Sequence, residues 1–283
     1  MKTTVLSVLT ACSVMSVQAT VFNYVVALDG QSEFPPNASS GTGVGTVSYD
    51  NVAHTLQLQV AFSGLTGNTT ASHIHAPTAF PFNLTNNAGV ATTTPTFAGF
   101  PAGVTSGTYS NTLDLTLASS YNPNFVTANG GTPSSAEAAL AAAIAQGRAY
   151  WNIHSSAFSG GEIRGFLVPE PPVITDLSAN PSVLWPPNQK MVPVTVSVET
   201  TGGSGTVVCQ IVGVTSNEPV FPADKGPDWG ITGPVTVNLR ADRSGHGNGR
   251  TYTITVECED EAGVLVTGDV TVTVPKSVPP QYP

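Results

Sequence analysis

Three of the five histidines of this chain lie in two short segments in which polar and apolar residues alternate. The first segment is Ser72-His73-Ile74-His75, and the second is Tyr150-Trp151-Asn152-Ile153-His154. Side chains two residues apart share one face of a β-strand, at a Cα separation of about 6.6 Å. If the apolar residues between them face a core, His73, His75 and His154 lie on a polar face. Pairing of the two strands would then bring three imidazoles together.

Three converging imidazoles favour two main interpretations. As structural groups, the histidines would hydrogen-bond strand backbone and the side chains of Asn152, Glu162 and Arg164, and no cofactor would be needed. As ligands, they would form a site for Zn²⁺ or Cu²⁺, which imidazole nitrogens bind at about 2.0–2.1 Å. A catalytic use of such a metal site, redox or hydrolytic, is a third alternative. The sequence alone leaves all three open.

Two charged residues follow the second histidine segment, in Gly161-Glu162-Ile163-Arg164-Gly165. Glu162 and Arg164 are two residues apart, so they share one face of a strand. They could clamp a charged ligand, or they could form an ion pair on one face or at a sheet edge. We expect the ion pair, which contributes little where it is exposed to solvent.

These segments resemble a known family. The His-x-His strand, the Tyr-x-Asn-Ile-His strand and the Gly-Glu-Ile-Arg-Gly segment are similar to the signatures of the CHRD (chordin-type) domain, and residues 24–35 fit its first strand and turn. The resemblance covers about residues 22–168. Residues 77–80 depart from it, because the family usually has glycine soon after His-x-His. The resemblance implies an immunoglobulin-like β-sandwich of extracellular proteins without known catalytic activity, in which Asn152, Glu162 and Arg164 are motif residues.

The charge of the chain excludes one class of partner. The 283 residues carry a formal net charge of −9, and the nine lysines and arginines are scattered along the whole length. A nucleic-acid-binding protein normally has a basic patch, so we exclude nucleic acid as a partner. The sequence also lacks the Gly-x-Ser-x-Gly motif of serine hydrolases. We therefore expect a non-enzymatic protein whose partners are extracellular proteins or glycans.

The first 19 residues have the features of a signal peptide. Lys2 is followed by an apolar stretch over residues 5–17, and Val17-Gln18-Ala19 fits the small-x-small pattern before a cleavage point. The sequence thus predicts a secreted protein with no membrane span after signal removal. In the alternative, Leu9-Thr10-Ala11-Cys12 is a lipoprotein cleavage box, and a lipidated Cys12 anchors the protein to a surface. The apolar segment before Cys12 is unusually short for this, which favours simple export.

The remaining sequence predicts an all-β chain with two immunoglobulin-like β-sandwich domains in tandem, at residues 20–168 and 174–276. Prolines 169, 171 and 172 predict an extended linker over residues 169–173, and residues 277–283 form a tail. One short helix is expected in the first domain. Ser134 and Glu137 would form its capping box, residues 138–145 its body, and Gly147 its end.

Two cysteines remain if the signal is removed, Cys209 and Cys258. Each shares a strand face with apolar residues, so both are expected to point inward. An even number of cysteines in an exported chain indicates a disulfide. We predict a bridge between two strands of the second domain. Residues 184–190 and 228–250 of that domain resemble an immunoglobulin-like domain that recurs in exported bacterial proteins.

Overall fold

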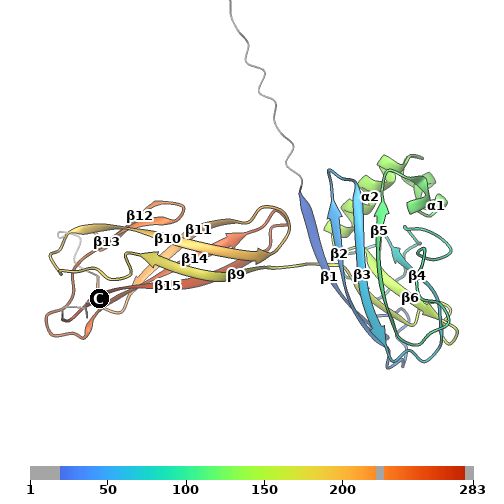
Figure 1. Cartoon of the computed structure of the whole chain (residues 1–283), viewed down its shortest axis with the longest axis horizontal. Coiled ribbons are helices and arrows are strands. Elements are labelled where there is room, and N and C mark those ends of the chain that lie inside the picture. The colour runs from blue at the N-terminus through green and yellow to red at the C-terminus, as the bar shows by residue number, and fades with distance from the viewer. Residues whose placement is uncertain (1–19, 221–225, 278–283) are drawn as a thin grey trace, which may run out of the picture.

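The computed structural model describes residues 20–220 and 226–277, which form two β-domains that follow each other along the chain (Figure 1). The predicted signal peptide, with Cys12, lies outside the described residues, as does most of the predicted tail. The expected all-β fold is confirmed, since strands dominate both domains. Within the described part of the chain, no helix has the length and apolar character needed to cross a membrane.

The first domain is built on a single antiparallel sheet of eight strands in the order β4-β6-β7-β1-β2-β3-β5, with β8 paired to β1. The strands are β1 (Val21–Asp29), β2 (Thr42–Asp50), β3 (Thr55–Ser63), β4 (Thr69–His75), β5 (Gly107–Asp114), β6 (Tyr150–Ser155), β7 (Ile163–Phe166) and β8 (Val168–Pro169). The long segment between β4 and β5 contains only isolated β-bridges, at Val90 and Thr92.

One hydrophobic core packs against one face of this sheet. In β3, apolar residues at every second position from Leu56 to Phe62 are buried, and the residues between them are exposed. Phe97, from the β4–β5 segment, joins the two ends of the sheet across the core. Its ring centre lies 5.8 Å from that of Trp151 in β6 and 5.9 Å from that of Tyr109 in β5. The sheet therefore bends over its own core, in the manner of a sandwich.

The prediction of a single helix in the first domain is wrong, because more than one helix is present, and the predicted capping residues are also wrong. The first domain contains η1 (Ala118–Ser120), α1 (Pro123–Ala128) and α2 (Pro133–Ala145). The capping box of α2 is formed by Thr132 and Ser135, not by Ser134 and Glu137. Pro133 explains the shift, because its fixed φ and missing N–H suit the first helical position and leave the cap to the residue before it.

Helix α2 lies over one end of the first domain and leads into the second histidine strand (Figure 1). Its side chains Leu140 and Ile144 are buried in the domain core. Gly147 follows the helix with a φ of 65°, the left-handed conformation predicted for its end. Strand β6 begins three residues later, so the helix fixes where this strand enters the sheet.

The second domain packs two sheets around its own core, with strand orders β12-β13-β10-β9 and β11-β14-β15. The strands are β9 (Pro172–Asn180), β10 (Met191–Gly202), β11 (Val208–Ser216), β12 (Trp229–Gly233), β13 (Thr236–Arg240), β14 (Gly249–Glu259) and β15 (Leu265–Pro275). The predicted disulfide between Cys209 and Cys258 is present. These residues face each other in register on β11 and β14, and Cys258 is fully buried.

Most of the segment expected to be a linker is built into strands. Val168 and Pro169 pair with β1, and β9 begins at Pro172. The two domains are also joined directly by hydrogen bonds. The backbone N–H of Asn23 donates to Ser204 Oγ (3.0 Å), and its side-chain Nδ2 donates to the Gly203 carbonyl (2.9 Å). The junction is therefore held by specific contacts and does not act as a free spacer.

Candidate metal centre

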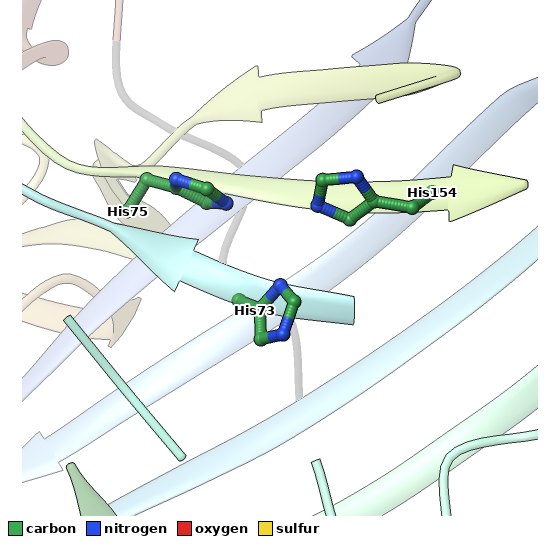
Figure 2. A group of neighbouring side chains, drawn as sticks. All are labelled: His73, His75 and His154. Atoms are coloured by element: carbon green, nitrogen blue, oxygen red, sulfur yellow. The ribbon is translucent and has the colours of Figure 1, made fainter. Parts of the chain in front are cut away.

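Strands β4 and β6 are neighbours in the sheet, and they bring the three histidines together (Figure 2). In the register of this pair, His73 lies opposite Asn152, and Ala71 lies opposite His154. Ile74, Trp151 and Ile153 point to the other face, into the core. The predicted division of the two strands into an apolar face and a histidine face is therefore confirmed.

The three imidazoles converge above the sheet. The ring centres of His73 and His154 are 5.3 Å apart, those of His73 and His75 are 5.7 Å apart, and those of His75 and His154 are 5.9 Å apart. One ring nitrogen from each residue belongs to a set of atoms that all lie within 4.8 Å of one another. His73 and His75 are buried, with 6% and 8% exposure, and His154 is partly exposed.

Each imidazole binds one backbone carbonyl through one ring nitrogen. His73 Nε2 lies 2.5 Å from the Pro95 oxygen, His75 Nδ1 lies 2.9 Å from the Ala88 oxygen, and His154 Nδ1 lies 3.0 Å from the Ser159 oxygen. A carbonyl only accepts hydrogen bonds, so these nitrogens carry the protons. The carbonyls belong to the loops that follow β4 and β6.

The other nitrogen of each ring is left without a hydrogen-bond partner. These atoms are His73 Nδ1, His75 Nε2 and His154 Nε2, and all three are buried. With the opposite nitrogen protonated, each carries a free lone pair. Buried polar atoms nearly always have a partner, so three orphaned acceptors in one place call for a ligand. The same arrangement, with one ring nitrogen fixed by an outer hydrogen bond, is usual for metal-binding histidines.

The surroundings keep the imidazoles neutral. Burial lowers the pKa of His75 to about 4, with smaller contributions in the same direction from the other two histidines and from Arg164. Burial also lowers the pKa of His73 and of His154, against the opposing effect of their carbonyl partners. A neutral imidazole is the form that binds a metal ion, so no proton must leave at neutral pH.

The arrangement fits the donor set of zinc or copper. In a tetrahedral site with bonds of about 2.0–2.1 Å, ligand nitrogens lie roughly 3.3 Å apart. The nitrogens here lie within 4.8 Å of one another, so shifts of about 1 Å in the side chains would bring them to bonding distance. Among the described residues, no cysteine or carboxylate joins the three histidines in this group.

The predicted motif residues surround this centre but do not bond to it. The side chain of Asn152 donates to Glu33 Oε2 (3.4 Å), and none of the three residues Asn152, Glu162 and Arg164 hydrogen-bonds a histidine ring. The structural interpretation, in which these side chains and the histidines knit the sheet together, therefore does not describe the rings. Their partners are loop carbonyls.

The ion pair expected between Glu162 and Arg164 is absent. Glu162 Oε1 accepts from Ser39 Oγ (2.6 Å) and from the Thr66 N–H (2.5 Å), which ties two loops to the residue that precedes β7. Arg164 donates to the Ser32 carbonyl and to Asn87 Oδ1 (2.8 Å). Both side chains are fully buried, so each acts through loop contacts and neither is available as a clamp for a ligand in solvent.

Tyr150 is a part of the site that the sequence did not identify as functional. Its ring stacks on His75 with a centre distance of 4.9 Å and an interplanar angle of 6°. Its hydroxyl accepts from the Ala88 N–H (3.2 Å), and the carbonyl of the same residue accepts from His75. The alternation of residues along β6 places Tyr150 on the histidine face. Only the structure shows that Ala88, in the loop after β4, hydrogen-bonds both the Tyr150 hydroxyl and the His75 ring.

Comparison with known protein families agrees with the position of these residues. The sequence model of the CHRD domain matches residues 24–167, which is half of the chain and includes both histidine strands. The chain belongs to the CHRD-domain family. No curated protein matches the sequence. The CHRD match ends next to β8, where the first domain ends and the junction begins.

The CHRD domain of this chain thus carries its most specific sequence motifs on one face of β4, β6 and β7. His73, Asn152 and Arg164 form a row across these strands, because Asn152 is in register with both of the others. In this CHRD domain, residues of the loops after β1 and β4 hydrogen-bond all three side chains of the row, which explains why such polar groups are buried.

Proposed function

We propose that this chain is an exported, non-enzymatic binding protein whose CHRD domain binds one zinc or copper ion through His73, His75 and His154. The single observation that carries this proposal is the pattern of the ring nitrogens. Three are protonated and bonded to carbonyls, and the other three are buried, unpartnered and turned toward one another. A bound ion would satisfy all three lone pairs at once.

The proposed ion would also have a structural role, because the three imidazoles are hydrogen-bonded to two loops. The carbonyl partners of His73 and His75 belong to the β4–β5 loop, and the partner of His154 belongs to the β6–β7 loop. An ion that fixes the three rings would also fix these loops on the sheet. Since two of the rings are buried, room for a substrate is restricted, which supports a role without catalysis.

Export is supported by features of both ends of the chain. The predicted signal peptide directs the chain out of the cytoplasm, and the disulfide of the second domain is typical of oxidising compartments. The CHRD family is in agreement with an extracellular protein. The second domain, which resembles immunoglobulin-like domains of exported bacterial proteins, would present the metal-binding domain or contact an extracellular protein or glycan.

Metal analysis of the full-length protein tests the proposal. The purified protein is stripped of metal, incubated with Zn²⁺ or copper, desalted and analysed by mass spectrometry. We expect one ion per chain, and we expect His75→Ala to abolish this stoichiometric binding. His246→Ala is the matched control, because His246 is exposed and lies in the second domain. Absence of stoichiometric metal in the wild-type protein, or full retention by His75→Ala, would contradict the proposal.

A further inference from the structure

The first described residue of the chain lies at the contact between the two domains. Thr20 directly precedes β1 and is buried, with 8% exposure. Its backbone N–H donates to Asn51 Oδ1 (3.2 Å), in the turn between β2 and β3. The carbonyl of the next residue, Val21, accepts from the Gly205 N–H of the second domain (2.8 Å). The backbone at Thr20 and Val21 is therefore bonded to both domains.

The loop between β10 and β11 forms the second-domain side of this contact. Gly205 in this loop has a φ of 67°, and a Cβ atom there would lie 2.7 Å from Thr20 Cγ2 and 2.6 Å from Glu261 Cδ. The absence of a side chain at Gly205 thus lets the side chains of Thr20 and Glu261 approach the same point. Glu261 is fixed by the loop, since its Oε1 accepts from the Thr206 N–H (3.0 Å) and its N–H donates to the Ser204 carbonyl (2.9 Å).

The carboxylate of Glu261 is a negative charge at the junction without a cationic partner. Hydrogen bonds lower its pKa, first from the Thr206 N–H and then from the side chain of Thr20, so it is ionised at neutral pH. Among the described residues, no ion pair within 4.0 Å includes Glu261. A positive charge on Thr20 would meet this carboxylate directly.

Export would give Thr20 such a charge. The sequence predicts that the signal peptide is cleaved after Ala19. Hydrolysis of this peptide bond adds the hydroxyl of water to the Ala19 carbonyl carbon and leaves Thr20 with a free amine. An α-amino group has a pKa of about 7.7–8.0, so at pH 7 it takes up a proton and becomes an ammonium group. One of its three protons continues to bond Asn51, and the others can be donated to Glu261.

We propose that removal of the signal peptide tightens the junction between the two domains, because the new α-ammonium group of Thr20 forms an ion pair with Glu261. This inference rests on the export and cleavage that the proposed function includes, and it is independent of the metal site. Before cleavage, the contact consists of neutral hydrogen bonds such as that from Gly205 to Val21. After cleavage, a charge of the first domain faces an opposite charge of the second. The mature protein therefore holds its domains in a more fixed relative orientation than its precursor.

The mass of the exported protein tests the first step. The complete chain is produced in a bacterial host, recovered from outside the cytoplasm and analysed by intact mass spectrometry. We expect a chain that begins at Thr20. A chain that begins at another residue, including a lipidated Cys12, would overturn this inference and leave the metal site to its own test.

Amide hydrogen exchange tests the ion pair in two forms of the protein, one that begins at Thr20 and one that keeps Gln18-Ala19 before it. The Gly205 N–H reports on the junction directly, because its hydrogen bond joins the two domains. We expect this amide to exchange about threefold more slowly in the form that begins at Thr20, an effect of the size typical of exposed ion pairs. The Val196 N–H, bonded to Val235 within the second domain, should exchange equally in both forms. Equal exchange at Gly205 would overturn the inference.

A substitution separates the effect of charge from that of chain length. In Glu261→Gln, a neutral amide replaces the carboxylate, so the difference between the two forms at Gly205 should disappear. Glu259→Gln is the matched control, since both glutamates are exposed and only Glu261 contacts the side chain of Thr20. We expect this control to keep the threefold difference. A difference that persists in Glu261→Gln would show that chain length and not charge causes it, and would overturn the ion pair.

Discussion

The two domains bury polar side chains in different ways. In the second domain, buried charges are paired: Arg250 lies 3.1 Å from Asp228 Oδ2 and 3.4 Å from Glu218 Oε2. In the CHRD domain, the three imidazoles face one another, and the nitrogens that converge have no partner. Buried ion pairs satisfy each other within the protein, whereas several buried imidazole nitrogens without hydrogen-bond partners indicate a site for a ligand. The proposed metal site would make buried polar groups a binding device in the first domain, whereas in the second domain they form ion pairs.

Metal addition is expected to separate the two domains most strongly. A ligand that binds only the folded state at 1,000 times its dissociation constant stabilises that state by about 4 kcal/mol. We expect zinc or copper to raise the free energy of unfolding of the CHRD domain by about this amount and thereby to raise its transition temperature. The transition temperature of the second domain should not change. Differential scanning calorimetry of the metal-free and loaded protein measures both transitions, and equal shifts in the two domains would contradict the assignment of the site.

The disulfide provides the reverse experiment. Replacing Cys209 and Cys258 together by serine removes the only cross-link among the described residues. We expect the second domain to lose about 2–4 kcal/mol, because the bridge restricts the unfolded chain. The CHRD domain should keep its transition temperature and its metal affinity. Calorimetry and metal titration of the double variant check both statements. Loss of metal binding would show that the two domains are energetically coupled, which their separate hydrophobic cores do not predict.

Glu33 is expected to give the CHRD domain a characteristic pH dependence. In the folded chain burial raises its pKa to about 7, from 4.5 for an unperturbed glutamate, so the folded state prefers the protonated form. Its contribution to stability is complete below pH 4.5 and is lost as the pH rises through 7. Glu33→Gln should therefore stabilise the domain at pH 8 by about 2–3 kcal/mol and have little effect at pH 4.5. Denaturant titrations at the two pH values measure this difference. An equal effect at both would contradict it.

The smallest expected effect concerns the helix cap. Thr132 Oγ1 accepts the N–H of Ser135 (3.2 Å), and Thr132→Ala should cost about 1 kcal/mol in the stability of the CHRD domain. Ser134→Ala is the matched control, because Ser134 was predicted to be the cap and does not cap α2 in the structure. A larger effect of Ser134→Ala than of Thr132→Ala in urea denaturation would reverse this assignment.

The sequence predicts those features that depend on alternation. Leu56 to Phe62 and the two histidine strands have the predicted faces, because one buried and one polar face leave little freedom in a strand. The partners of the histidines could not be predicted, since Ala88, Pro95 and Ser159 act through their carbonyl groups, which every residue possesses. The hydrogen-bond partners of Glu162 and Arg164 could not be predicted either, because they belong to loops distant in sequence.

The use of backbone carbonyls to orient the imidazoles has a consequence for how this site can change during evolution. Because the carbonyl oxygen is common to all amino acids, the hydrogen bonds to the rings do not depend on the side chains at positions 88, 95 and 159. An insertion or deletion between 88 and 95, in contrast, would displace one carbonyl relative to the other. Divergent relatives can therefore keep a working site with no sequence identity in these loops, provided that the loop lengths are preserved.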